Sequence, residues 1–188
     1  AVLRNTSLKK GDIYRLSALQ DERERIASAL QSSGYYYFSD NYLFFAADSS
    51  LGSRNIALQL MINPETPEMA FRKYYFRKLI LNATYNPADP SNDTLRFGAT
   101  TIITDGFLRP EVLLRRNFIE PGAVYSKHNY KQTYDKLSSL GILRYVKPSI
   151  NRFENTDSLD VHFDLVSRYP LSFNASVDFS TATNNYTG

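Results

Sequence analysis

The sequence predicts an α+β fold, with helices packed on one face of a sheet, and predicts it twice along the chain. The first observation is a repeat: GDIY at 11–14 and GAVY at 122–125 each precede a polar residue, a helical pattern and a Gly. The second is that two strand-like segments joined by a turn follow each helix. The third is alternation of apolar with other residues in these strands, which gives each sheet one buried face.

The first helix is predicted over 17–33. Its apolar residues recur at helical spacing: Leu16, Leu19, Ile26 and Leu30, with Ala27 beside them. Ser17 and Gln20 have the spacing of a capping box. Negative charge is expected near the positive end of the helix dipole, from Asp21, Glu22 and Glu24. Gly34 is expected to end the helix in a left-handed conformation.

The second helix is predicted from Ser126, a candidate N-cap, to Gly141. Its apolar stripe consists of Tyr130, Tyr134, Leu137 and Leu140. Both helices end in a segment of small residues and Gly, at 30–38 and 137–146. A shorter helix is expected over 109–118, because Pro110 would stand at its first position.

Strands are predicted at 42–45 and 56–62 after the first helix, and at 145–154 and 159–166 after the second. The last strand of each pair has an apolar row: Ile56, Leu58, Leu60 and Ile62 in the first copy, and Leu159, Val161, Phe163 and Leu165 in the second. Another strand-like stretch at 71–82 opens the second copy. The Pro-rich segment 63–68 is the predicted boundary, and 86–94 is a predicted polar loop. The residues from there to 105 follow no clear pattern.

Composition excludes several classes of protein. The chain has 188 residues, 43% apolar and 22% charged, which is typical of globular domains. It has no apolar run long enough for a membrane-spanning helix, and its lack of Cys excludes disulfides and thiol chemistry. The net charge is +3, and the basic stretches at 72–78 and 109–116 are short and interrupted, which favours solvated faces over nucleic acid or an anionic lipid surface. Without an initiator Met or a signal peptide, the chain is expected to be a trimmed piece of a longer protein.

The sequence offers no catalytic or cofactor-binding motif, so we expect neither an enzyme nor a bound cofactor. G-x-S-x-G, P-loop and G-x-G-x-x-G patterns do not occur. Asp160, His162 and Asp164 project to one side of a strand, but residues two apart along a strand are about 7 Å apart, too far for one metal ion. The tyrosines at 35–37 and at 74–75 could stack on sugars or bases, but strand formation and core packing are the favoured interpretation.

The repeated unit resembles a POTRA domain, the polypeptide-transport-associated module that precedes a β-barrel in the BamA/TamA surface-antigen family. The residues that carry the resemblance are 11–14 and 25–38 in the first copy, and 121–125, 134–143 and 145–146 in the second. It implies tandem β-α-α-β-β units with helices on one face of a small mixed sheet. The units would be 1–64, without its opening strand, and 70–167, with an insertion at about 87–108.

The C-terminal residues add to the resemblance. Residues 171–179 alternate apolar with polar side chains, as strands of a membrane barrel do. The resemblance implies that 168–188 begins a C-terminal barrel, joined to the second unit through Arg168, Tyr169 and Pro170. The alternative is an extra edge strand of a soluble domain.

The resemblance also implies a function: a periplasmic region, attached to the outer membrane through that barrel, which orients the barrel and binds accessory assembly proteins. Unfolded outer-membrane or exported polypeptides, and not nucleic acid, would add as strands to an open sheet edge at 145–154. The residues expected to bind them are Tyr145, Val146, Ser149, Ile150, Asn151, Arg152 and Phe153, with Pro148 interrupting the edge.

Two alternatives to client binding stay open. The units could form a semi-rigid arm, stiffened by the prolines near 63–68 and at 170, that holds partners without binding clients. The chain could also be a free-standing periplasmic or extracellular module that binds peptides or glycans, with the aromatic face of 35–37 as the glycan site.

Overall fold

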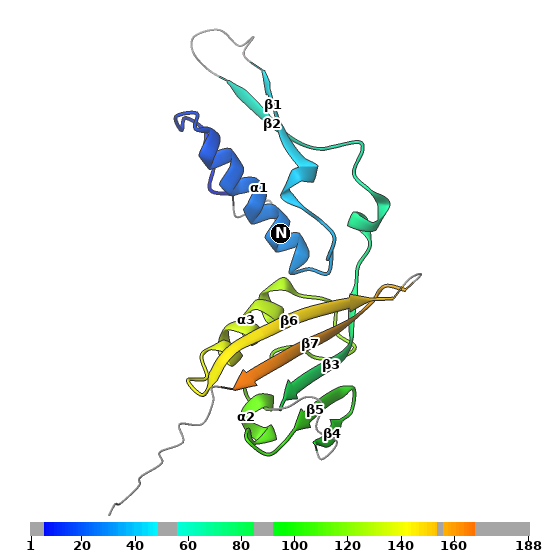
Figure 1. Ribbon diagram of the computed structural model, residues 1–188. Helices are drawn as coiled ribbons and strands as arrows, with labels where there is room; N and C mark the ends of the chain where they lie inside the picture. The colour runs from blue at the N-terminus through cyan, green and yellow to red at the C-terminus, as the bar shows by residue number, and fades with distance from the viewer. Residues whose placement is uncertain (1–5, 49–55, 85–91, 154–155, 168–188) are drawn as a thin grey trace, which may run out of the picture.

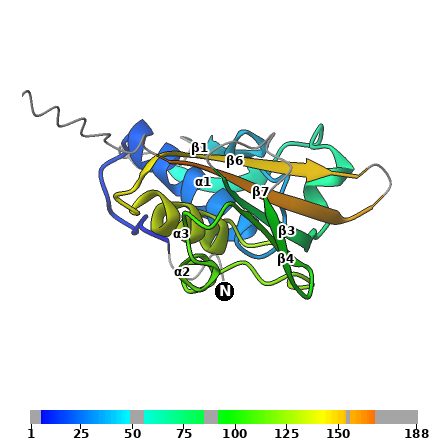
Figure 2. The same cartoon turned by 60° about the horizontal axis from the view of Figure 1, so that its bottom comes forward.

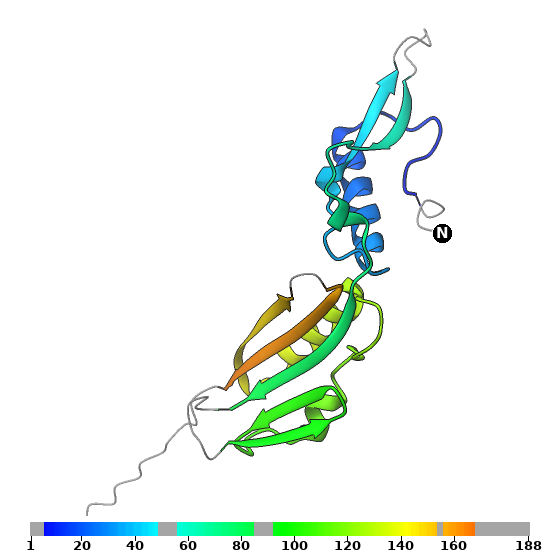
Figure 3. The same cartoon turned by 90° about the vertical axis from the view of Figure 1, so that its right-hand side faces the viewer.

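The computed structural model describes residues 6–48, 56–84, 92–153 and 156–167, and it has the predicted α+β architecture (Figure 1). A two-stranded sheet has the order β1-β2, and a five-stranded sheet has the order β4-β5-β3-β7-β6. We refer to the parts built on these sheets as the first and second unit. The two units lie end to end along the long axis of the molecule (Figure 3).

In the first unit, one long helix packs against an antiparallel hairpin. The helix α1 (Leu16–Gln31) leads through a short 3-10 turn, η2 (Asp40–Tyr42), into β1 (Leu43–Asp48), which pairs with β2 (Ala57–Ile62). Its core consists of Ile26, Ala27, Phe38, Leu43 and Ala70. A second 3-10 turn, η3 (Glu68–Phe71), lies in the connection to the second unit.

The start of α1 differs from the sequence-based expectation. Its N-cap is Arg15, whose side chain makes no capping hydrogen bond, so the capping box predicted at Ser17 and Gln20 is wrong. Leu16 is 71% exposed, because the core cluster gathers around the later turns of the helix and does not reach the first one. At the other end, Gly34 has φ +108°, as a left-handed stop requires.

The second unit is a mixed sheet covered by helices on one side (Figure 2). Its strands are β3 (Tyr75–Ala83), β4 (Asp93–Phe97), β5 (Thr100–Thr104), β6 (Leu143–Arg152) and β7 (Ser158–Ser167), and its helices are α2 (Pro110–Leu114) and α3 (Lys127–Ser138). β3 pairs in parallel with both β5 and β7, whereas β6 is antiparallel to β7. The core joins Leu113 of α2 and Leu137 of α3 to the inward row of β7.

Two elements of the second unit depart from the expectation. The helix α2 is shorter than 109–118, because Asn117 bonds the backbone of Ile119 on both sides: Nδ2 donates to its carbonyl at 2.8 Å, and Oδ1 accepts from its N–H at 2.9 Å. The end of the predicted loop and the unpatterned stretch after it form the hairpin β4–β5, which turns at Gly98 and adds two strands beyond β3. Within the described ranges, no helix is both long and apolar enough to cross a membrane.

Candidate functional site: the β6 edge and the joint between the units

The strand β6 stands at the end of the five-stranded sheet. It pairs with β7, and among the described residues no strand pairs with its other side. Six of the seven predicted binding residues lie on β6, and Phe153 follows it directly. The structure therefore places six of the seven on one open edge strand and the seventh directly after it.

These side chains divide between the two faces of the sheet. Val146 and Ile150 pair with Leu165 and Val161, and they lie on the face that carries the helices. Tyr145, Ser149 and Asn151 lie on the opposite face, where Tyr145 is 52% exposed. An added strand would therefore contact polar and aromatic side chains on one face and the rim of the core on the other.

Pro148 lies in the middle of this edge. The pairing with β7 continues without a shift from Val146 to Arg152, and Pro148 stands opposite Phe163. Because Pro is tolerated in a strand only where its missing N–H faces away from the neighbour, we infer that the nitrogen of Pro148 faces the open side. Alternation then directs the backbone groups of Val146 and Ile150 to the same side. The edge thus has donors on each side of a gap at Pro148.

The far end of β6 is tied to the rest of the sheet by Arg77. Its guanidinium bonds both carboxylate oxygens of Asp160, at 2.7 and 2.6 Å, and lies 3.8 Å from the ring centre of Phe153. The bond to Asp160 raises the pKa of Arg77. Asp164 accepts a hydrogen bond from Asn82 at 3.3 Å. The two carboxylates around His162 thus have protein partners, and the described part of the chain contains no cluster of three metal-ligating side chains.

The joint between the units is built from aromatic side chains. The ring of Tyr36 lies 4.9 Å from that of Tyr125, nearly perpendicular to it, and Tyr37 lies 5.2 Å from Tyr74. Burial raises the pKa of Tyr36, Tyr74 and Tyr125. Tyr36 and Tyr37 are half-buried in this cluster, so their rings already have protein partners where a glycan would stack.

The segment that follows α1 also contacts the second unit through two hydrogen bonds. Tyr74 N–H donates to the carbonyl of Gly34 at 2.9 Å, and His128 N–H donates to Ser32 Oγ at 3.2 Å. A Cβ at Gly34 would lie 2.5 Å from Cγ1 of Val124. The sequence predicted Gly34 only as a helix stop, but the structure also uses it as a point of close approach between the units.

The edge and the joint meet at Arg152. Its guanidinium lies 5.4 Å from the ring centre of Tyr37, so the last residue of β6 contacts the first unit. A polar cleft of about 560 Å³ lies elsewhere on the joint, between α1, η2 and the start of α3. Its lining carries charges of both signs: Asp21, Glu24, Asp40, Arg25 and Lys127.

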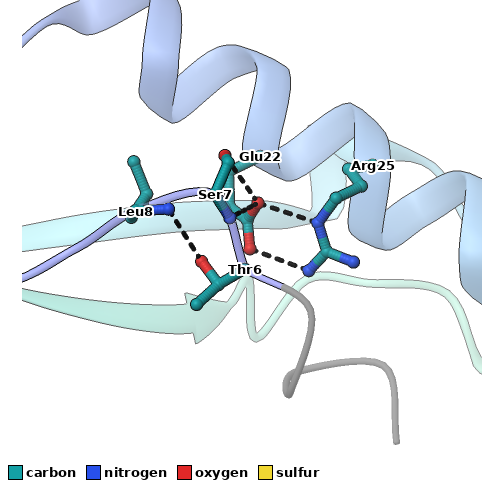
Figure 4. Close-up of polar contacts among 5 residues, drawn as sticks. All are labelled: Thr6, Ser7, Leu8, Glu22 and Arg25. Atoms are coloured by element: carbon teal, nitrogen blue, oxygen red, sulfur yellow. Dashed lines mark hydrogen bonds and ion pairs between the residues drawn. The ribbon is translucent and has the colours of Figure 1, made fainter.

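Glu22 has a role that the sequence did not indicate. It is buried, and both of its carboxylate oxygens accept from Arg25 at 2.8 Å, while Ser7 donates to it through N–H and Oγ at 3.4 and 3.3 Å (Figure 4). The hydrogen bonds from Arg25 lower the pKa of Glu22 to about 2, although its burial acts in the opposite direction. Glu22 thus ties the N-terminal segment to α1, whereas the sequence suggested only a charge near the helix dipole.

Comparison with solved structures gives the fold. The chain resembles "The crystal structure of BamA from Haemophilus ducreyi lacking POTRA domains 1-3", with a TM-score of 0.56 and 19% identity over 86% of this chain. It also resembles "POTRA1-3 of the periplasmic domain of Omp85 from Anabaena", with a TM-score of 0.39 and 16% identity over 84% of this chain. The chain covers 25% of the first structure and 53% of the second.

No protein-family model matches the sequence, and no curated protein matches it closely enough to report. The likeness in fold to the Haemophilus ducreyi structure therefore stands on the arrangement of helices and strands. That arrangement matches the expectation in the second unit, where helices cover one face of a mixed sheet, whereas in the first unit one helix packs against a two-stranded antiparallel sheet. The described part of this chain has the fold of the POTRA region of BamA-like proteins.

Proposed function

We propose that the chain is the periplasmic POTRA region of an outer-membrane β-barrel assembly or translocation protein, and that it binds extended client chains as added strands. The observation that carries this proposal is the open edge of β6. Main-chain hydrogen bonds along such an edge supply affinity regardless of client sequence, and the side chains beside it supply selectivity. A protein that handles many unfolded chains needs both affinity that does not depend on the client sequence and side chains that select among clients.

The wider assignment is part of the same proposal. We assign the two units to 1–64 and 70–167, and the junction with a barrel to Arg168, Tyr169 and Pro170, which lie outside the described residues. Unfolded outer-membrane or exported polypeptides would be the clients, and accessory assembly proteins would bind other parts of the region. The likeness to a BamA structure supports this assignment at the level of the fold.

Pro148 would keep this edge selective. A continuous edge invites pairing with any exposed strand, including that of a second molecule, whereas a gap in the row of donors limits each pairing to a few residues. Clients would therefore bind weakly and dissociate rapidly. Such behaviour suits a region that passes chains on and does not retain them.

The test is a titration of the isotope-labelled chain with peptides from unfolded outer-membrane proteins, followed by amide NMR. We expect the largest shifts at 145–153 and small ones on β4, the opposite end of the same sheet. If peptides shift other amides while those from 145 to 153 stay in place, the edge assignment is wrong.

A matched pair of variants sharpens the test. Pro148→Ala restores one backbone donor on the open side, and a net hydrogen bond of about 1 kcal/mol corresponds to roughly fivefold tighter client binding. Pro110→Ala, at the first turn of α2, makes the same chemical change away from the edge and should leave binding unchanged. Equal effects of the two variants would contradict the proposed role of Pro148.

A second candidate function is a semi-rigid arm that holds the barrel and its partners in a fixed orientation. The joint favours it, because edge-to-face aromatic contacts, two hydrogen bonds donated by backbone N–H groups and the close approach at Gly34 all connect the units. The chain has no Cys, so one spin-labelled Cys can be placed in each unit. A narrow distribution of label distances is expected, and a broad one would exclude the rigid arm.

A further inference from the structure

We propose that the β6 edge selects acidic segments: extended chains with carboxylate side chains at positions that face the strand. This inference rests on the proposed function, because it names the chemistry of the client at the same edge. Its basis is the distribution of charge along β6. The strand carries three cations and no acidic residue: Arg144, Lys147 and Arg152.

The positive charge of Arg144 and Lys147 on β6 is available to a partner, whereas Arg152 already lies against the ring of Tyr37. All three cationic side chains are exposed, and among the described residues neither Arg144 nor Lys147 has an ion pair within 4.0 Å. The nearest acidic strand, β7, has Asp160 bound by Arg77 and Asp164 bonded by Asn82. Asp164 stands opposite Lys147 in the strand register but, among the described residues, forms no ion pair with it, so Arg144 and Lys147 can still pair with carboxylates from outside.

The other edge strands of the molecule show that this charge is not a general feature of its edges. The strand β1, which occupies the place of β6 in the first unit, contains one acidic residue, Asp48, and no cation. The strand β4, at the opposite end of the same sheet, contains one residue of each sign, Asp93 and Arg96. Of the three edge strands compared, β6 alone carries an excess of positive charge, and it is the strand to which client binding is assigned.

The spacing of the cations fits a paired strand. Lys147 and Arg152 lie on opposite faces of the sheet, so a carboxylate can meet a cation on either face of an added strand. Cross-strand pairs of opposite charge are favourable and those of like charge are unfavourable. Summed over Arg144 and Lys147, this difference corresponds to about tenfold tighter binding of an acidic segment than of a basic one.

The experiment compares two labelled peptides with the same length and the same valines, one alternating Val with Glu and the other Val with Lys. Binding to the whole chain is measured by fluorescence anisotropy at low and high salt. We expect the Glu peptide to bind about tenfold more tightly at low salt, and the ratio to shrink as salt screens the charges. Equal affinity of the two peptides would overturn the inference.

Charge-reversal variants localise the effect. Lys147→Glu should reduce or invert the preference, whereas Arg96→Glu on β4 makes the same change of charge in the same sheet and should leave it intact. If Arg96→Glu reduces the preference as much as Lys147→Glu does, only the net charge matters and the inference fails.

Two further outcomes separate this inference from its premise. If both peptides shift the amides of 145–153 with equal affinity, the acidic preference is wrong and client binding at β6 stands. If neither peptide shifts these amides, both proposals fail. The last measurement uses vesicles that contain phosphatidylglycerol. If these vesicles bind the chain, Lys147→Glu abolishes that binding, and the two peptides bind with equal affinity, then the positive charge serves a lipid surface and the inference is overturned.

Discussion

The last strands of the two units carry the same apolar alternation and differ sharply in exposure. In β7, the side chains of Leu159, Val161 and Phe163 are fully buried, and Leu165 is 1% exposed. In the first unit, Ile56 is 45% exposed, Leu58 37% and Ile62 46%. β7 lies between β3 and β6 and under the helices, whereas β2 has β1 as its only strand partner among the described residues.

This difference separates two properties that a sequence pattern combines. Alternation determines which side chains share a face of a strand, because successive residues point to opposite sides. It does not determine how much covers that face, because the cover comes from distant elements such as β3 and α3. The same row of side chains is therefore a core in one unit and half-exposed in the other.

The largest expected effect tests this contrast directly. Leu165→Ala removes a buried side chain from the second unit and should lower the free energy of unfolding by about 2–5 kcal/mol. Leu58→Ala makes the same change in the corresponding row of β2, where the side chain already contacts water, and about 1 kcal/mol or less is expected. Chemical denaturation measures both, and equal losses would remove the contrast.

The next effect concerns the joint. Gly34→Ala places a Cβ 2.5 Å from Val124 and also requires a left-handed residue, so we expect a loss of about 2–4 kcal/mol and a wider range of angles between the units. Gly11→Ala is the control, because Gly11 has φ +94° but open space around it, and about 1 kcal/mol is expected. Thermal unfolding and spin-label distances measure the two effects. A Gly34→Ala chain with an unchanged distance distribution would contradict the role of this contact.

A smaller effect depends on pH. Because the folded pKa of Glu22 lies at about 2, below its ordinary value, the carboxylate stabilises the fold above pH 4.5 and loses this contribution as pH falls toward 2. The contribution is on the order of 2 kcal/mol, since Arg25 is partly exposed to solvent. Chemical denaturation at a series of pH values measures this contribution, and Glu22→Gln should reduce the loss of stability between pH 4.5 and 2. If the variant loses as much stability over this range as the unchanged chain, other carboxylates cause the loss.

The smallest effect is the exposed counterpart of that ion pair. Lys131 and Asp135 form a pair one turn apart on α3 with both side chains largely in water. Asp135→Asn should change the free energy of unfolding by less than about 0.5 kcal/mol. The two ion pairs therefore extend the comparison between covered and exposed groups from apolar to charged side chains.

The sequence predicted the elements that rest on local patterns. The helices were predicted because apolar residues such as Ile26 and Leu30 in α1, and Tyr134 and Leu137 in α3, recur at helical spacing. The hairpins β1–β2 and β6–β7 were predicted because their last strands alternate, whereas β4–β5 was not. The edge position of 145–153 followed from the resemblance to POTRA units. All of these residues except Phe153 lie on β6 in the structure, and their binding to clients stays a prediction.

Features that depend on distant contacts could not be predicted in the same way. In β5, the buried face consists of Thr100, Ile102 and Thr104, so threonines stand at two of the three positions where the alternation rule expects apolar residues. Thr104 satisfies its buried hydroxyl by donating to the carbonyl of Leu108. Likewise, the tyrosines at 36 and 37 resemble strand residues in sequence, and their packing in the joint requires Tyr74 and Tyr125 from another part of the chain.

The hairpin β4–β5 has a consequence for the order of folding. Leu79 in β3 pairs with Thr100 in β5 and with Val161 in β7, so its two partners differ greatly in their distance along the chain. Contacts between near segments close smaller loops and form at a lower entropic cost. When the chain is synthesised from its N-terminus, β5 can therefore pair with one side of β3 before β7 has been synthesised. The most apolar strand of the sheet would then spend less time with both edges open to neighbouring chains.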